Sequence, residues 1–552
     1  MRVAIPQQQH LPAAIAALGL LFLAVFLLYP LLQVFGASLL NADGTSLTLA
    51  NYVKILGRPF YRGAIVNTLS IGAAATLITT LLAVPMAFAL VRLPVPGKAA
   101  ILAVAALPLV LPSFVSAYAI VLLLGNGGIV TRWLHGIGLG FGSIYGARGI
   151  VLVYVLTLYP YVLLPTVAAF KAVDVSMEEA AQGLGSSPGR TVATVILPIV
   201  LPAILAGALL VFIETLENFG VPFVLAEDLP IFAVEAFKLF IGETAPNPAA
   251  AGVLAMVLIG CTVVALIAQR GLLSARRFAT GARRSAPPIA VAPRTRRLAT
   301  VCCWTVITLA LVPFVAVVVI AFLKFRGPVL QQGFSLDNFA QLFANAHRPL
   351  ANTLVLATIA ALGATLIGVP IGYLVTRTRT RMASLIDVVA TAPFAVAGTV
   401  LGIGLIMAFG HGILILTGTA VIMVIAYMVR KLPFSVRSAG AILHQIDPSL
   451  EEASINLGVP PLLTFWRVTV PLMLGGIVGG LTLTFVTIAS ELSSTIVLYS
   501  APWTTMTVAM FHALEGSSPG VASAAATMLI VVTIVPVALV YRLLRKYELS
   551  MM

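Results

Sequence analysis

Charged side chains are scarce in this chain of 552 residues: Asp, Glu, Lys and Arg make up 9% of it, whereas hydrophobic residues make up 60%. Soluble domains carry about 25% charged residues, so the composition excludes a soluble enzyme or binding domain of this length. Mean hydropathy is +1.08, and a run of about 20 apolar residues is long enough to cross the hydrocarbon core of a bilayer. We therefore expect an all-α polytopic membrane protein with about 12 transmembrane helices.

The boundary between the expected ninth and tenth spans is the weakest, because only Gly410, His411 and Gly412 interrupt the apolar run there. The expected spans are 12–34, 64–91, 99–124, 149–171, 199–224, 250–270, 298–323, 352–376, 384–409, 413–430, 472–499 and 520–542.

Residues that catalyse reactions or hold metals are also few. Cys261, Cys302 and Cys303 lie in or beside apolar spans, where cysteine acts as a small packing residue and not as part of a disulfide framework. The six histidines have no ligand spacing, so no metal site is expected. The stretch 183–191 resembles a phosphate-binding loop only superficially, since Arg190 occupies the place of the required lysine. We expect no catalytic residues and no cofactor bound by this chain.

The net charge of +14 could suggest nucleic acid, but the bases lie in loops beside apolar spans, so no nucleic-acid partner is expected. Lys and Arg accumulate on the cytoplasmic side of membrane proteins. With both termini in the cytoplasm, 23 of the 32 Lys and Arg lie inside and 9 outside. The inside set includes the bases of 276–297, Arg377, Arg379, Arg381, and the pair Arg430 and Lys431.

One polar sequence occurs twice between apolar segments, over Val173–Pro198 and over Ile446–Pro471, at a constant offset of 273 residues. The identical pairs are Asp174 and Asp447, Glu178 and Glu451, Glu179 and Glu452, Ala180 and Ala453, Leu184 and Leu457, Gly185 and Gly458, and Pro198 and Pro471. Further matches, including Asn67-Thr68-Leu69 with Asn352-Thr353-Leu354, Arg92 with Arg377 and Pro108 with Pro393, share an offset of 285.

This duplication predicts two parallel six-helix repeats, related by a pseudo-two-fold axis along the membrane normal. We expect a first half over 1–270, an Arg- and Pro-rich cytoplasmic linker over 271–297, and a second half over 298–552. Within each duplicated loop, acids in the first turn favour a short helix. Gly185 and Gly458 suit the left-handed residue that ends one, so a helix and a sharp turn lead into the next span.

The duplicated loop resembles the EAA loop of ATP-binding-cassette importer permeases, in which Glu-Ala-Ala and a later Gly precede a branched residue and Leu-Pro. Ser454 in place of Ala, Val470 in place of Leu, and Val195 and Val468 in place of Ile are the departures. The residues that the resemblance assigns to ATPase coupling are Glu178, Glu179, Ala180, Ala181, Gly185, Glu451, Glu452, Ala453, Ser454 and Gly458.

The resemblance covers essentially the whole chain, which is similar to two type I importer permeases fused in one polypeptide. It implies a multi-pass protein of the bacterial inner membrane. It also implies two kinds of partner. Two copies of a separate ATPase subunit would bind the ATP, which this chain does not bind, and an extracytoplasmic solute-binding protein would deliver the substrate.

Acidic residues inside a bilayer are costly and mark either a pathway or a buried polar network that joins helices. Glu214, Glu217 and Glu491 lie within the expected fifth and eleventh spans, and Asn218 aligns with Glu491. The expected pathway residues are Glu214, Glu217, Asn218, Ser490, Glu491, Ser493 and Ser494.

The phrases ETLENFG and SELSSTIVLY are most similar to ferric-iron importer permeases, so ferric iron is the expected substrate. The alternatives are the same machinery for aminoethylphosphonate, thiamine, a sugar phosphate or a polyamine, and a proton-coupled secondary transporter that uses the three acids. An intramembrane enzyme would need a nucleophile-base pair or a metal signature, and the sequence shows neither.

Overall fold

Helices form nearly all of the regular structure in the computed structural model, which describes residues 10–41, 46–140, 142–241, 247–274, 289, 291–327, 329–378, 381–516 and 518–550. In these ranges ten helices are long and apolar enough to cross a membrane, or up to eleven if the bent pair 381–395 and 398–409 is one span. Contacts divide the chain into unit 1, comprising 1–51, 239–253 and 321–552, and unit 2, comprising 52–238 and 254–320. The all-α membrane class predicted from composition is confirmed.

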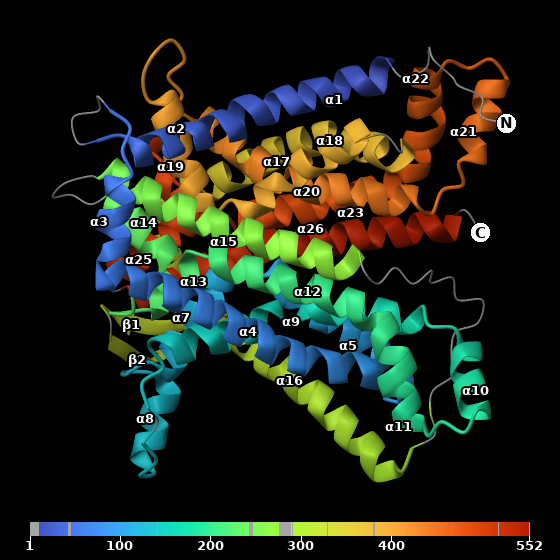
Figure 1. The fold of residues 1–552 in the computed structure, drawn as a ribbon. Coiled ribbons are helices and arrows are strands. Elements are labelled where there is room, and N and C mark those ends of the chain that lie inside the picture. Colours follow the sequence, from blue (N-terminus) through green and yellow to red (C-terminus); the bar gives the residue numbers. More distant parts are fainter. Residues whose placement is uncertain are drawn as a thin grey trace. The chain divides into compact units, whose positions relative to one another are not determined.

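Three helices that pack on one another form the centre of unit 2: α4 (Pro59–Arg92), α9 (Ala147–Lys171) and α12 (Leu197–Glu217). Figure 1 shows α8 and the α10–α11 segment at opposite ends of this unit. Its other elements are α3 (Ala50–Gly57), α5 (Lys98–Ala105), α6 (Leu107–Val110), α7 (Ser113–Leu124), α8 (Ile129–Gly136), α10 (Val175–Gly183), α11 (Pro188–Thr191), the π-helix η2 (Val192–Ile196), α13 (Gly220–Leu225), α14 (Phe232–Ile241) and α16 (Pro293–Ala321).

Unit 1 repeats this centre with α17 (Asp337–Arg377), α20 (Ala420–Leu443) and α23 (Val470–Ala489), while α15 (Pro248–Ser274) crosses from unit 1 into unit 2. Helices α1 and α2 pack on α17 and α19, respectively. The remaining elements of unit 1 are α1 (His10–Leu23), η1 (Ala24–Leu28), α2 (Tyr29–Leu39), the antiparallel strands β1 (Leu323–Arg326) and β2 (Val329–Phe334), α18 (Arg381–Thr391), η3 (Ala392–Ala395), α19 (Gly398–Phe409), α21 (Ser449–Asn456), α22 (Pro461–Thr464), η4 (Phe465–Thr469), α24 (Thr495–Leu498), η5 (Ala501–Trp503), α25 (Met506–Glu515) and α26 (Pro519–Ser550).

The two units make the same internal hydrogen bonds at repeated sequence positions. In unit 2 the Thr68 hydroxyl accepts the backbone N–H of Phe232 at 3.0 Å. In unit 1 the aligned Thr353 hydroxyl accepts the N–H of Met506 at 2.8 Å. A buried N–H needs a partner, so the repeated Asn-Thr-Leu sequence fixes the start of α14 and of α25 against the long helix of its own unit.

Contacts group the first membrane helices differently from the sequence repeat. Unit 1 contains α1 and α2 from the first half of the sequence, and unit 2 contains most of α16 from the second half. The predicted boundaries 1–270 and 298–552 describe the repeat and stay a prediction. Most of the predicted linker, 275–288 and 290, lies outside the described residues, as does Arg379.

Matching prolines break one predicted span in each half. The predicted third span, 99–124, is divided into α5, α6 and α7 around Pro108 and Pro112. The predicted ninth span is divided after η3, which contains Pro393, and its two parts, 381–395 and 398–409, meet at 102°. Proline removes a backbone N–H and clashes with the preceding turn, so a helix bends or ends there.

The predicted tenth span, 413–430, is wrong at both ends. Residues 410–419 form a loop in which Gly412 and Gly418 have positive φ, and α20 begins only at Ala420 and continues to Leu443. Arg430 and Lys431 had been interpreted as charges in a loop after the span, but both lie within α20. The sequence did not reveal the carboxylate that allows two adjacent bases to stand inside an apolar helix.

Candidate functional site

The duplicated loop folds in each unit into two short helices joined by a sharp turn, α10–α11 in unit 2 and α21–α22 in unit 1, and we call each of these an elbow. The first helix of each elbow begins with the same cap. The Asp174 carboxylate accepts the backbone N–H of Ser176 at 3.0 Å, and that of Asp447 accepts the N–H of Ser449 at 2.9 Å. The backbone N–H and then the hydroxyl of Ser449 lower the pKa of Asp447. Each carboxylate thus occupies one of the free N–H groups of a helix N-terminus.

Both elbow helices end in a left-handed glycine, as the sequence predicted. Gly185 and Gly458 have φ of 85° and 86°. The residue after each glycine donates its N–H back to the helix, to Ala181 at 3.0 Å and to Ser454 at 3.2 Å. This pattern closes the last turn and reverses the chain, and other residues rarely adopt that φ.

A buried ion pair fastens the unit 2 elbow to α4, and we call it the unit 2 latch. Arg92, the last residue of α4, donates from Nη1 to Glu178 Oε1 at 2.6 Å and from Nη2 to Glu178 Oε2. The two residues are 3% and 6% exposed. The arginine also lies at the negative end of the α4 dipole. Glu178, which the resemblance assigned to ATPase coupling, therefore faces its own chain.

The aligned pair forms the unit 1 latch with a different set of donors. Arg377, the last residue of α17, donates from Nε to Glu451 Oε1 at 3.1 Å and from Nη2 to the Ile446 carbonyl at 3.1 Å. The Tyr373 hydroxyl donates to Glu451 Oε2 at 2.9 Å. The aligned residue in unit 2 is Phe88, which has no hydroxyl. The unit 1 carboxylate thus has a neutral donor that the unit 2 carboxylate lacks.

The outer face of each elbow is exposed and carries the same residue types in both units. Glu179 and Ala180, like Glu452 and Ala453, are exposed, as are both glycines. Ala181 and Ser454 are half-buried. Large apolar side chains lie on the same face: Met177 and Leu184 are 47% and 90% exposed, and the aligned Leu450 and Leu457 are 48% and 85% exposed.

The departure at Ser454 from the Glu-Ala-Ala pattern has a local explanation. Its hydroxyl lies 2.9 Å from that of Thr464 in α22 and makes a hydrogen bond between the two arms of the elbow. In unit 2 the aligned pair is Ala181 and Thr191, and the Thr191 hydroxyl is buried with no hydrogen-bond partner among the described residues. Serine at position 454 thus satisfies a hydroxyl that stays unsatisfied in the other elbow.

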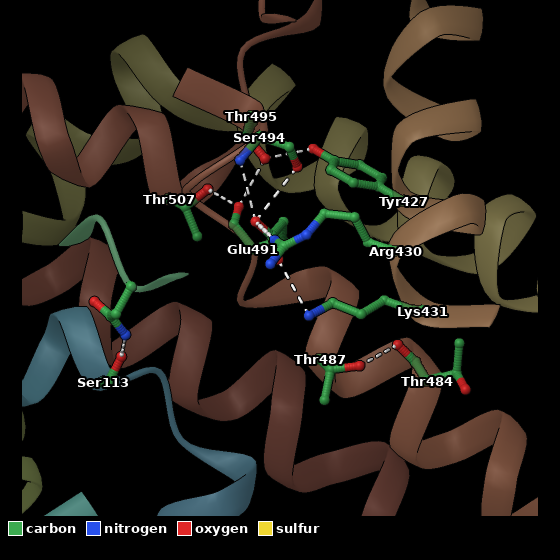
Figure 2. Close-up of polar contacts among 11 residues, drawn as sticks. Ser113, Tyr427, Arg430, Lys431, Thr484, Thr487, Glu491, Ser494, Thr495 and Thr507 are labelled. Carbon is green, nitrogen blue, oxygen red and sulfur yellow. Dashed lines mark hydrogen bonds and ion pairs between the residues drawn. The ribbon is translucent and has the colours of Figure 1, made fainter. Parts of the chain in front are cut away.

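Of the predicted pathway residues in unit 1, Glu491 has a buried carboxylate that lies just after the end of α23 and is surrounded by polar side chains (Figure 2). Arg430 and Lys431 reach it from α20: Arg430 Nη1 pairs with Oε1, and Lys431 Nζ lies 3.2 Å from Oε2. Ser494 donates its backbone N–H to Oε1 at 3.1 Å and its hydroxyl at 3.3 Å. The Thr495 hydroxyl bonds both the Glu491 carbonyl and Tyr427. Glu491 is therefore the centre of a polar network that joins α20 to the end of α23.

A neutral version of the same arrangement stands in unit 2. The Asn218 side chain accepts the backbone N–H of Val221 at 2.9 Å and donates to the Ser113 hydroxyl at 3.0 Å. Glu214 and Glu217 lie half-buried in the last turns of α12. The remaining predicted pathway residues in unit 1, Ser490 and Ser493, are half-buried beside Glu491. The Ser490 hydroxyl has no hydrogen-bond partner among the described residues.

Sequence reasoning missed the partners of these glutamates. The repeat had matched Arg92 with Arg377 and Glu178 with Glu451. An arginine and a glutamate that both recur in each half could have suggested that they pair with each other. No such signal pointed to Arg430 and Lys431, because the aligned residues of the first half are Thr157 and Leu158.

Comparison with known proteins identifies the family. Residues 79–273 and 364–551 each match the family described as binding-protein-dependent transport system inner membrane component. The chain is 28% identical over 527 residues to the ferric transport system permease protein FbpB of Actinobacillus pleuropneumoniae, covering 93% of this chain and 75% of that protein. A ferric transport relative in Haemophilus influenzae is 28% identical over 496 residues, covering 87% of this chain and 77% of the relative.

A relative of a different type matches a shorter part. The 2-aminoethylphosphonate transport system permease protein PhnU of Salmonella typhimurium is 32% identical over 209 residues, which is 37% of this chain and 72% of that protein. Two matched regions, one in each half, with elbows of the same construction, confirm the predicted duplication of an importer permease. The chain therefore belongs to the family of inner-membrane components of binding-protein-dependent transport systems, as a permease of the ATP-binding-cassette importers with two permease halves in one polypeptide.

Proposed function

We propose that this chain is the translocating subunit of a ferric-iron importer, and that two copies of a separate ATPase bind its two elbows. The observation that carries this proposal is the outer face of the elbows, which is presented twice with the same side chains. Leu184 and Leu457 are 90% and 85% exposed at aligned positions. A large apolar side chain exposed at the same place in both copies suits a surface that a partner covers. Two like surfaces on one chain favour one kind of ATPase used twice.

The latches give each elbow a route to the membrane helices. Force on the outer face of α10 reaches α4 through Glu178 and Arg92, and it reaches α12 through α11 and η2. In unit 1 the same two routes run through Glu451 and Arg377 to α17, and through α22 and η4 to α23. A closing ATPase pair would thus move two helices of each unit together.

The substrate proposal rests on the ferric transport relatives, which match nearly the whole chain. The half-buried carboxylates of Glu214 and Glu217 are oxygen ligands of the kind that suits a hard cation, whereas the Glu491 carboxylate already pairs with Arg430 and Lys431. We propose that Glu214, Glu217, Asn218, Ser490, Glu491, Ser493 and Ser494 line the pathway, with both chain termini in the cytoplasm. A solute-binding protein would deliver the substrate from the opposite side. The second candidate substrate is 2-aminoethylphosphonate, which only the shorter match to PhnU favours.

The substrate is tested by deleting the chain from its host and measuring uptake of radiolabelled ferric iron, 2-aminoethylphosphonate and thiamine in parallel. Loss of iron uptake alone, restored by the intact chain, supports the proposal. Normal iron uptake with loss of one organic solute would overturn the substrate and leave the importer assignment intact.

The elbow assignment is tested with the double variant Glu179→Lys and Glu452→Lys. Both side chains are exposed, so the fold should tolerate the change while the ATPase no longer binds. The matched control, Asp228→Lys with Glu515→Lys, makes the same change in net charge at exposed acids away from the elbows. We expect the ATPase to co-purify with the control and not with the elbow variant. Equal co-purification and uptake for the two variants would contradict the assignment.

A further inference from the structure

An apolar cavity of about 560 Å³ lies within unit 2 between α16 and the group formed by α4, α9 and the start of α12. Figure 1 shows α16 running obliquely to α4. Phe88 and Phe170 stand at the edge-to-face distance of 5.8 Å in its wall, and Leu298 and Cys302 approach from α16. The cavity is partly open to the surroundings.

This volume is large for a cavity in a folded protein. Packed interiors hold few voids larger than one water molecule. Water is disfavoured here because it needs two to four polar partners. Thr295 and the two thiols of Cys302 and Cys303 are the only side chains with polar atoms among the lining residues. Lipid acyl chains are the apolar groups that surround a membrane helix in large excess, so an acyl chain is the expected occupant of this cavity.

Basic side chains accompany the lining residues of three separate elements. Arg294 and Arg296 flank Thr295 at the start of α16, and both are exposed. Exposed Lys171 follows Phe170 in α9, and exposed Arg190 precedes η2 by two residues. In the sequence no acid lies within two residues of any lining position. Clustered bases beside an apolar crevice favour an anionic headgroup over a zwitterionic one.

At the position aligned with Val192, unit 1 has a larger side chain that is buried. Val192 lines the cavity, and its counterpart is Phe465. Phe465 is 7% exposed and packs in a cluster with Val369, Leu443 and Met473. Its ring also meets that of Tyr373, with centroids 4.9 Å apart. A phenylalanine at this position is therefore compatible with the elbow fold, and the smaller Val192 leaves more space at this position in unit 2.

We propose that an anionic phospholipid binds in this cavity, with one acyl chain between α16 and α4 and its phosphate at Arg294 and Arg296. The bound chain supports the unit 2 elbow. Leu93 lines the cavity, and the carbonyl of its neighbour Arg92 accepts the N–H of Ile289 at 2.7 Å. Arg92 thus joins the segment before α16 to the latch, so a filled cavity stabilises both.

The test is the phospholipid retained by the purified full-length chain, identified and counted by native mass spectrometry and lipid extraction. We expect one retained phosphatidylglycerol or cardiolipin per chain. Val192→Phe, which copies the unit 1 residue, should reduce retention to less than a tenth. Ala299→Leu fills the same cavity from α16, and it serves as the test if Val192→Phe does not fold. No retained lipid in the unaltered chain, or undiminished retention in a folded filled variant, would overturn the proposal.

The headgroup is tested separately with Arg294→Gln and Arg296→Gln together. This variant should bind phosphatidylethanolamine and phosphatidylglycerol equally, whereas the unaltered chain should prefer phosphatidylglycerol about tenfold. The matched control, Arg276→Gln with Arg277→Gln, removes the same charge from the linker and should keep the preference. Equal binding of the two lipids by the unaltered chain would overturn the anionic assignment.

Discussion

The two latches should differ in strength, although the sequence repeats their ion pair. Arg92→Met leaves the Glu178 carboxylate, 6% exposed, without both guanidinium hydrogen bonds. Removing one partner of a buried ion pair costs about 3–5 kcal/mol. Arg377→Met leaves Glu451 bonded to the Tyr373 hydroxyl at 2.9 Å. A hydrogen bond to a charged group contributes about 1.5–3 kcal/mol. Arg377→Met should therefore destabilise its elbow by that much less than Arg92→Met does.

The local measurement is hydrogen exchange of the elbow backbone, because a membrane protein of this size has no single unfolding free energy. Each 1.4 kcal/mol changes an equilibrium tenfold, so Arg92→Met should accelerate exchange over α10 by about 100- to 4,000-fold. Exchange over α21 in Arg377→Met should rise much less. Adding Tyr373→Phe, which copies Phe88 of unit 2, should remove that difference.

Two outcomes would refute this reasoning. Equal acceleration of α10 and α21 in the two arginine variants would show that Tyr373 does not support Glu451. Unchanged exchange over α10 in Arg92→Met would show that the latch does not hold the elbow. The double variant Arg92→Met with Glu178→Met serves as the control, because an apolar pair of similar volume should restore much of the lost stability.

The remaining predictions concern single hydrogen bonds and close contacts. Ala181→Ser should give the buried Thr191 hydroxyl a partner and slow hydrogen exchange over α10 by an amount that corresponds to about 1 kcal/mol; faster exchange would contradict it. Gly398→Ala would place a methyl group 2.6 Å from Arg430 Nη1, so it should destabilise unit 1 by about 1–3 kcal/mol and reduce uptake. Gly479→Ala, which meets nothing within 4 Å, is the control for thermal stability and uptake, and equal effects of the two would refute the reasoning.

Sequence reasoning predicted the features of this fold that depend on local chemistry. Apolar runs marked the membrane helices, and the glycines at 185 and 458 marked the ends of the elbow helices, because both signals are carried by a few adjacent residues. It failed where a distant partner decides the outcome. Arg430 and Lys431 resemble loop charges until Glu491, about 60 residues later in the chain, is placed beside them.

The elbow glutamates show the same division between local and distant information. The sequence placed Glu178 and Glu179 in one helical turn and gave both to the ATPase surface. Which of two adjacent acids faces inward depends on where the last residue of α4 stands, and only the fold brings Arg92 to Glu178. Glu179 stays exposed on the other side of the same turn.

The aligned positions 218 and 491 show how far the two halves have diverged within a shared geometry. Asn218 and Glu491 each accept the backbone N–H three residues later, so both keep the same task at the start of a short helix. The other side chains that contact Asn218 and Glu491 differ between the two halves. Ser113 supplies a hydroxyl to the amide, whereas the aligned Gly398 leaves the space that Arg430 needs to reach the carboxylate. A buried carboxylate is costly without a cation, and Arg430 needs that space to reach it, so a single substitution at position 218 or 491 should leave the other residues of its set mismatched. The repeat therefore preserves the backbone hydrogen bond while each half keeps its own charge.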